Sequence, residues 1–419
     1  MKFFYGWWIV LAAILCQFAS MSVGQAVIGV FMNPVIDDLG WKVWEFTLGS
    51  SLAVGGGAIS AMVAGRIVDS KGPRPLILIG SVVSGICLFL LSLQSNLFVF
   101  LALYSIAGLV GWNFFGPPVI NATLSKWFIS QRGWALSLGS IGISLAGLIT
   151  PFFMTVIVDS FSWRTGYTTL GISVVVLLIP IAFVMRRRPE DYGLQPDGKV
   201  LANGSPQDTK INQIERASLT VTEAIRTKSF WSLVFGFGLI MGALMSVLIH
   251  AIPFTVESGF SRTIAAAAIT VNGIGNLSGK FFWGYALQRF DSRKLVFLAY
   301  FLSALGVALM LSTPNNLNIT ILFSAFFLYG LGFGGTIPLS QFLWAKYFGR
   351  THIGTINGVA HPMTTLSTAL APVLVGYGYD VYQTYLPAFI LIICAYILGA
   401  FIVLISKEPV LVDTSKSNI

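Results

Sequence analysis

The chain has 419 residues, of which 55% are hydrophobic and only 10% charged, with a formal net charge of +9. An ordinary soluble domain carries about 25% charged residues, so the composition excludes a soluble protein and predicts an all-α membrane protein. The positive charge does not indicate a nucleic-acid partner, because the lysines and arginines fall in short loops between apolar segments. The three cysteines lie inside apolar segments and offer neither a disulfide framework nor metal-ligand spacing.

Twelve apolar segments follow one another along the chain, each close to the roughly 20 residues that cross a bilayer as a helix. The predicted spans are 7–31, 44–68, 75–93, 97–123, 133–157, 166–185, 230–254, 263–286, 294–312, 317–343, 353–378 and 385–406. A polar stretch divides them evenly. We therefore expect a first six-helix bundle over 1–186, a cytoplasmic linker over 187–229, a second six-helix bundle over 230–408 and a cytoplasmic tail over 409–419.

The basic residues predict the orientation of the chain in the membrane. Nearly all of them, including Arg186, Arg187 and Arg188 and those of the linker, fall on the side that holds both termini. Cytoplasmic loops carry an excess of lysine and arginine, so we expect both termini in the cytoplasm. The short loops and the absence of a recognisable organelle signal favour the bacterial inner membrane.

The two halves repeat each other in sequence. Pro34 and Pro253 are 219 positions apart, and Pro118 and Pro338 are 220 apart. Because each half has an even number of spans, the repeat is parallel and predicts two bundles related by a pseudo-two-fold axis along the membrane normal. In such carriers the substrate binds near the midplane between the halves, and one half rocks against the other to give alternating access.

Lys280 is the leading candidate for a functional residue. It lies inside the predicted span 263–286, which contains no Asp or Glu. A charge at the bilayer centre costs about 2.5 kcal/mol or more, so such residues usually face a water-filled cavity and carry function. A cation held there suits a small organic anion as substrate. The alternative is that Lys280 extends its ammonium group to the membrane interface.

Two histidines next to prolines are further candidates. His250 precedes Pro253, and His361 precedes Pro362 in a span expected to line the cavity. Histidine titrates near neutral pH, so either side chain can relay a proton or bond a carboxylate. Each can equally serve as a hydrogen-bonded packing residue.

Asn113 lies in the glycine- and proline-rich stretch 111–118, which predicts a broken helix that exposes backbone to the cavity. Its amide can bond a substrate oxygen, although intramembrane asparagine more commonly links helices. The remaining substrate-binding candidates are Asn276, Phe281, Tyr329 and Gln25.

The stretch Gly65-Arg-Ile-Val-Asp69-Ser-Lys-Gly-Pro-Arg74 resembles the motif between spans 2 and 3 of the major facilitator superfamily. A degenerate second copy covers 284–294, where Gln288 replaces the acid. The resemblance implies that Asp69 and Arg74 clamp the cytoplasmic helix ends when the carrier is open outward. Charge that merely sets topology is the alternative. The same gating role is assigned to Arg132 and Arg293.

Three further motifs are similar to the monocarboxylate-transporter and oxalate/formate-antiporter branch of that superfamily: Tyr5–Trp8, Lys126–Phe128 and Arg132–Ala135. In that branch an arginine of span 8 pairs with the substrate carboxylate, and Lys280 occupies its position. Asn276 stands one turn earlier, where animal relatives have an aspartate. Lysine keeps the charge but lacks the planar two-pronged grip of arginine, and asparagine removes one proton carrier.

The sequence therefore predicts proton-coupled symport of a monocarboxylate of the lactate or pyruvate class by a protein that acts as a monomer in the lipid bilayer. Carboxylate exchange is the alternative within the transporter class, and a non-transporting membrane sensor is the alternative outside it. No cofactor or metal is expected. An enzyme is disfavoured, because no nucleophile–base pair or metal cluster falls at one membrane depth.

Overall fold

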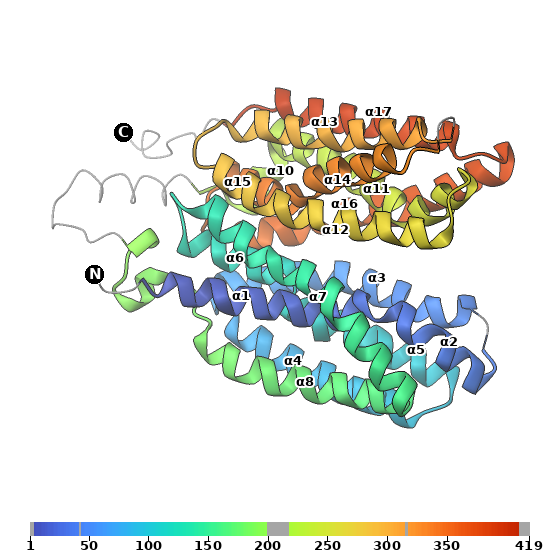
Figure 1. Ribbon diagram of the computed structural model, residues 1–419. Coiled ribbons are helices and arrows are strands. Elements are labelled where there is room, and N and C mark those ends of the chain that lie inside the picture. The colour runs from blue at the N-terminus through green and yellow to red at the C-terminus, as the bar shows by residue number, and fades with distance from the viewer. Residues whose placement is uncertain (1–3, 42, 199–217, 315–316, 410–419) are drawn as a thin grey trace. The chain divides into compact units, whose positions relative to one another are not determined.

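The computed structural model describes residues 4–41, 43–198, 218–314 and 317–409. Within these ranges the chain forms helices and no strands (Figure 1). Helices suit a membrane protein, since each satisfies its own backbone hydrogen bonds where no water is available. The chain divides into two compact units, Met1–Glu215 with Arg350–Val359 and Arg216–Gly349 with Ala360–Ile419.

In the described residues before the linker, the first unit contains eight α-helices. In Figure 1, α4 runs beside α8 and α1 runs beside α7, and these are its most extensive helix pairs. The helices are α1 (Gly6–Met21), α2 (Ile28–Leu39), α3 (Val43–Ser70), α4 (Arg74–Leu93), α5 (Leu97–Ile106), α6 (Pro117–Trp127), α7 (Arg132–Ser160) and α8 (Trp163–Val184).

Two predicted spans of this unit are interrupted. A π-helical turn, Ser22–Ala26, follows α1, and a second, Ala107–Gly111, follows α5 and leads into a 3₁₀ turn, Trp112–Phe115. The break between α5 and α6 agrees with the glycines and prolines of 111–118. The two interruptions are linked, because the Ser20 hydroxyl donates to the Trp112 carbonyl at 3.0 Å. Such π-turns often mark functional sites.

Glycine allows α1 and α7 to approach closely. A Cβ atom at Gly142 would overlap the carbonyl oxygen of Ile14, whereas one at Gly147 on the same helix would meet nothing within 4 Å. Small residues at a helix interface allow such backbone contact.

We expect Gly142→Ala to destabilise the protein by about 1–3 kcal/mol, because an overpacked interface must shift its backbone. Gly147→Ala is the matched control and should be neutral or stabilising by about 0.5–1 kcal/mol, since alanine favours the helix. Thermal unfolding of the purified protein in detergent measures both. Equal unfolding temperatures for the two variants would contradict this account of the α1–α7 contact.

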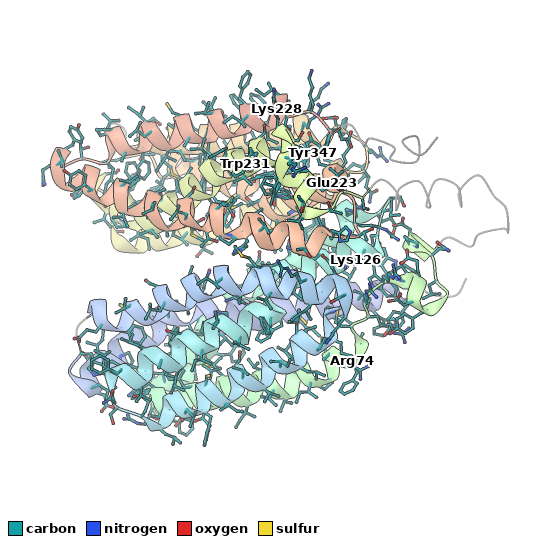
Figure 2. All side chains as sticks on the ribbon, turned by 180° about the vertical axis from the view of Figure 1, so that it is seen from behind. Arg74, Lys126, Glu223, Lys228, Trp231 and Tyr347 are labelled. Carbon is teal, nitrogen blue, oxygen red and sulfur yellow. The ribbon has the colours of Figure 1, made fainter. Side chains whose placement is uncertain are left out.

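The second unit contains α10 (Val221–Arg226), α11 (Lys228–Glu257), α12 (Arg262–Ala286), α13 (Ser292–Leu311), α14 (Ile319–Gly334), α15 (Thr336–Phe348) and α17 (Leu386–Ile405). The helix α16 (Ile353–Tyr382) crosses the boundary between the units. Within the second unit α12 packs along α14, and α17 packs against both α11 and α13. Glu223, Lys228, Trp231 and Tyr347 gather at one end of this unit (Figure 2).

Eleven helical segments of the described chain are long and apolar enough to cross a membrane. The remaining predicted span, 263–286, corresponds to α12, which is 25 residues long but carries Asn272, Asn276 and Lys280. These polar side chains lower its mean hydropathy below that of its neighbours. The helix that carries the leading candidate residue, Lys280, is therefore also the most polar of the long helices in the described chain.

The predicted linker is described in two parts. Short 3₁₀ turns at Pro189–Tyr192 and Pro196–Gly198 precede the undescribed stretch 199–217, and α10 follows it. Thr220 and Glu223 form a capping box at the start of α10. The predicted tail, 409–419, lies outside the described residues except for its first residue.

Candidate functional site

Lys280 lies on a polar stripe of α12. Asn272, Asn276 and Lys280 are spaced four residues apart and so share one face of the helix. All three are buried, with 5%, 7% and 3% of their surface exposed. The stripe therefore groups one cationic and two amide side chains at buried positions along α12.

Close packing of α12 on α14 fixes the position of this stripe. A Cβ atom at Gly279 would overlap the Leu331 carbonyl oxygen, and one at Gly334 would overlap the Asn276 carbonyl oxygen. The backbones of the two helices are thus in direct contact over the turn of α12 that precedes Lys280. Phe281 follows Lys280 but is 45% exposed, so its ring lies on a different face of α12 from the stripe.

His250 links three helices of the second unit. Its Nε2 lies 3.1 Å from the Pro372 carbonyl oxygen in α16, and its Nδ1 lies 3.4 Å from the Tyr385 hydroxyl at the start of α17. His361 has a local partner, because its Nδ1 lies 3.1 Å from the Thr365 hydroxyl one turn along α16. The structure describes no contact between either histidine and Lys280.

Tyr329 is buried in the second unit, and its hydroxyl is hydrogen-bonded there. Its side chain is 1% exposed, and its hydroxyl donates to the Leu244 carbonyl at 3.1 Å. The same hydroxyl accepts a hydrogen bond from Tyr396 at 3.3 Å. These bonds tie α14 to α11 and α17, so both the donor and an acceptor position of this phenol are engaged.

The two candidates of the first unit lie at its helix interruptions. The Asn113 amide donates to the Gly108 carbonyl and packs against Gly57, where an added Cβ would overlap it. Asn113 therefore satisfies a carbonyl of the π-helical turn, as an interhelical packing residue would. Gln25 lies in the other π-helical turn and is exposed.

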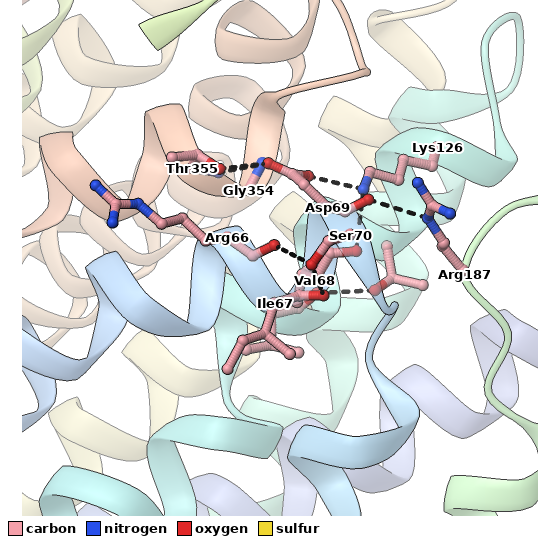
Figure 3. Close-up of polar contacts among 11 residues, drawn as sticks. Arg66, Ile67, Val68, Asp69, Ser70, Lys126, Arg187, Gly354 and Thr355 are labelled. Atoms are coloured by element: carbon pink, nitrogen blue, oxygen red, sulfur yellow. Dashed lines mark hydrogen bonds and ion pairs between the residues drawn. The ribbon is translucent and has the colours of Figure 1, made fainter.

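Asp69 is the centre of a charged cluster at the end of α3 (Figure 3). Its carboxylate pairs with Lys126 Nζ at 2.7 Å, and both side chains are less than 10% exposed. It also accepts hydrogen bonds from the backbone N–H of Gly354 at 3.2 Å and of Thr355 at 2.8 Å, and from the Thr355 hydroxyl at 2.7 Å. Asp69 thus caps the first turn of α16, where unpaired N–H groups favour an anion.

The other predicted gating residues have different neighbours. Arg74 lies over the Phe183 ring, 4.3 Å from its centroid, and Figure 2 shows it well apart from Lys126. Arg132 is buried and its Nε donates to the Phe128 carbonyl at 3.2 Å. The structure therefore brings Asp69 together with Lys126, and not with Arg74.

Arg293 lies at the start of α13, where its Nε is 3.4 Å from Asp291 and its Nη1 donates to the Ser406 carbonyl at 3.3 Å. Asp291 caps the same helix through the backbone N–H groups of Arg293 and Lys294. Although partial burial opposes ionisation, these hydrogen bonds hold the pKa of the Asp291 carboxyl below its ordinary value. The second copy of the motif, 284–294, thus provides the N-terminal cap of α13.

Sequence reasoning missed the partners that complete the Asp69 cluster. Arg350 pairs with Glu190 of the linker and donates to the Lys126 carbonyl at 2.9 Å. Arg187 donates to the Asp69 carbonyl at 3.0 Å. A cavity of about 30 Å³ lies among these side chains, and a space of that size holds about one or two waters. In the sequence, Lys126 is notable only as part of a motif, and Glu190 only falls within the predicted linker.

Among the described residues, no group of three or more His, Cys, Asp or Glu side chains is placed to hold a metal ion. The charged groups instead form the Asp69 cluster and the polar stripe of α12. Neither arrangement contains a paired nucleophile and base. Both are suited to binding charge and to holding helices.

The sequence profile of the Major Facilitator Superfamily matches residues 10–261 and 245–418. Monocarboxylate transporter 11 of Mus musculus is 22% identical over 95% of this chain and 87% of its own length. The oxalate:formate antiporter of Oxalobacter formigenes is 25% identical over 78% of this chain and 74% of its own length.

Among solved structures, the proton:xylose symporter XylE superimposes with a TM-score of 0.78 at 15% identity and covers 95% of this chain and 94% of its own. At that identity the likeness concerns the fold. It agrees with the all-helical architecture and with the profile match across both halves of the sequence. The chain is therefore a membrane transporter, not an enzyme, and belongs to the major facilitator superfamily.

Proposed function

We propose that the protein carries a small monocarboxylate of the lactate or pyruvate class across the membrane, in symport with a proton. The observation that carries this proposal is the buried Lys280 on the polar stripe of α12. Relatives named as a monocarboxylate transporter and an oxalate:formate antiporter support a carboxylate substrate.

Lys280 binds the substrate carboxylate in this proposal. Burying an ammonium group inside a membrane protein is unfavourable unless an anion or other polar groups compensate. A carboxylate that arrives from water supplies such compensation and leaves again when the site opens. Asn276, one turn earlier on the same face, adds an amide that can bond a carboxylate or hydroxyl oxygen.

Asp69 controls the conformational cycle in this proposal. Its carboxylate holds the first turn of α16, and the boundary between the two units falls inside that helix. A carrier that alternates between two open states must change the contacts of such a shared helix. We expect the bonds from Gly354 and Thr355 to Asp69 to form in one state and break in the other.

We further propose that the protein acts as a monomer in a bacterial inner membrane. The excess of lysine and arginine in the loops supports a cytoplasmic position for both termini, and the short loops favour a bacterial inner membrane. The carrier works as a monomer, since each chain contains both six-helix halves.

Flux through purified protein tests the proposal. The protein is reconstituted into proteoliposomes, and uptake of radiolabelled lactate is followed with and without an inward proton gradient. We expect the gradient to drive accumulation. Uptake that occurs only into vesicles preloaded with another carboxylate would favour exchange instead. Saturable lactate binding with no flux in either experiment would favour a sensor.

A further inference from the structure

His250 is held in one tautomer by its surroundings. A carbonyl oxygen only accepts hydrogen bonds, so the Nε2 atom that lies 3.1 Å from the Pro372 oxygen must carry the ring proton. In the neutral ring, Nδ1 is then the acceptor, and the Tyr385 hydroxyl at 3.4 Å donates to it. Nδ1 is therefore the one atom of this ring that can take up a proton.

Both charge states of His250 can be satisfied at this place. When Nδ1 binds a proton it becomes a donor, and the Tyr385 hydroxyl oxygen can accept after rotation about its C–O bond. The bond from Nε2 to Pro372 persists in both states. Protonation therefore reverses one hydrogen bond without leaving a buried donor or acceptor unpaired, which would cost about 1–3 kcal/mol.

The helix that carries His250, α11, ends at the acidic residue Glu257. The Tyr385 ring stacks on Tyr379 with centroids 4.3 Å apart, and the Tyr379 hydroxyl is hydrogen-bonded to the Glu257 carboxylate. Glu257 follows His250 by two helical turns on α11, so the two share a face. Tyr385 is the titratable side chain that contacts the imidazole, and Tyr379 and Glu257 follow behind it.

We propose that His250 and Tyr385 form the proton-binding site of the carrier. This assigns His250 to coupling rather than to the substrate, and it rests on the proposed proton symport. One proton adds to Nδ1, no bond other than N–H forms, and the site gains one positive charge. Because the imidazole joins α11 to α16 and α17, its charge state acts on helices that also carry the transport cycle.

Nuclear magnetic resonance tests the site without reference to any substrate. The protein has three histidines, so ¹⁵N-histidine labelling in bilayers gives few signals, and His250→Gln identifies the one of interest. We expect the neutral ring to be the Nε2–H tautomer and the charged ring to carry its second proton on Nδ1. An Nδ1–H tautomer of the neutral ring, or a ring that stays neutral when the sample is acidified, would overturn the proposal.

Transport provides the second test. Glutamine at position 250 can donate to Pro372 and accept from Tyr385 but cannot titrate, so His250→Gln should retain lactate counterflow while proton-driven accumulation falls at least tenfold. His352→Gln, in the loop before α16, is the matched control and should behave like the unmodified protein. Undiminished proton-driven accumulation in His250→Gln would contradict the coupling role. Absence of lactate flux in the unmodified protein would instead contradict the proposed function and leave the resonance test to decide the proton site.

Discussion

Lys280→Ala is expected to abolish concentrative lactate uptake in proteoliposomes. A hydrogen bond to a charged group contributes about 1.5–3 kcal/mol, and each 1.4 kcal/mol changes affinity about tenfold. The apparent affinity for lactate should therefore fall about tenfold to hundredfold. Lys280→Arg should retain transport, because it keeps the charge and adds a second donor toward the carboxylate.

The control for this experiment is Lys228→Ala, which removes an exposed lysine at the start of α11. It lowers the net charge of the protein by the same amount and should leave uptake unchanged. Lys280→Met separates function from folding, since an apolar side chain avoids the unfavourable burial of a charge. We expect it to unfold at no lower temperature than the unmodified protein and yet to lose uptake. Unimpaired uptake in Lys280→Ala would refute the assignment of Lys280 to the substrate.

Sequence reasoning predicted the helical architecture because hydrophobic length is a strong and local signal. Each described span is a run of apolar residues, and glycine and proline mark the break at 111–118. The π-helical turns were not predicted. A turn such as Ser22–Ala26 differs from the surrounding α-helix by one extra residue per turn, and its composition does not distinguish it.

Contacts between residues far apart in the sequence could not be predicted in the same way. The partners of Asp69 in α16 follow it by 285 and 286 positions, and no local pattern connects them. The internal repeat gives one partial signal. Gln288 stands where the first copy has Asp69, while Lys346 corresponds to Lys126. The second copy thus keeps the lysine but lacks the aspartate. The Nζ atom of Lys346 instead lies 3.8 Å from Oε2 of Glu408.

The candidate substrate residues show why composition alone ranks them poorly. Tyr329 and Asn113 are polar residues within spans, but the structure engages the hydroxyl and the amide in bonds to backbone carbonyls. A sequence pattern gives the position of such a side chain along a helix and not its hydrogen-bond partner. Lys280 differs because a buried cation demands compensation whatever its neighbours are.

Asp69→Asn is expected to destabilise the protein and to slow transport. The side chain keeps its size but loses its charge, so the buried Lys126 loses its ion pair and the N–H groups of Gly354 and Thr355 lose an anionic acceptor. Removing one partner of a buried pair costs about 3–5 kcal/mol. We expect the unfolding temperature to fall by about 5 °C or more. Amide hydrogen exchange in the peptide 350–359 should become faster, because these N–H groups are held less firmly.

Asp38→Asn is the matched control, because it removes a carboxylate whose partner is solvent-exposed. The Nη1 atom of Arg164 lies 2.5 Å from Oδ2 of Asp38. Hydrogen bonds from Arg164 and Trp163 hold the pKa of the Asp38 carboxyl below its ordinary value. Exposed pairs contribute little to stability, so unfolding and uptake should change little.

The double variant Asp69→Asn with Lys126→Met removes the unpaired charge and should recover part of the lost unfolding temperature. Its exchange in 350–359 should stay fast, because the anionic cap of α16 is still missing. That separation tests whether Asp69 acts on α16 directly or only by neutralising Lys126. If Asp69→Asn and Asp38→Asn proved alike in unfolding, exchange and uptake, Asp69 would have no role in holding α16, and the gating assignment would fail.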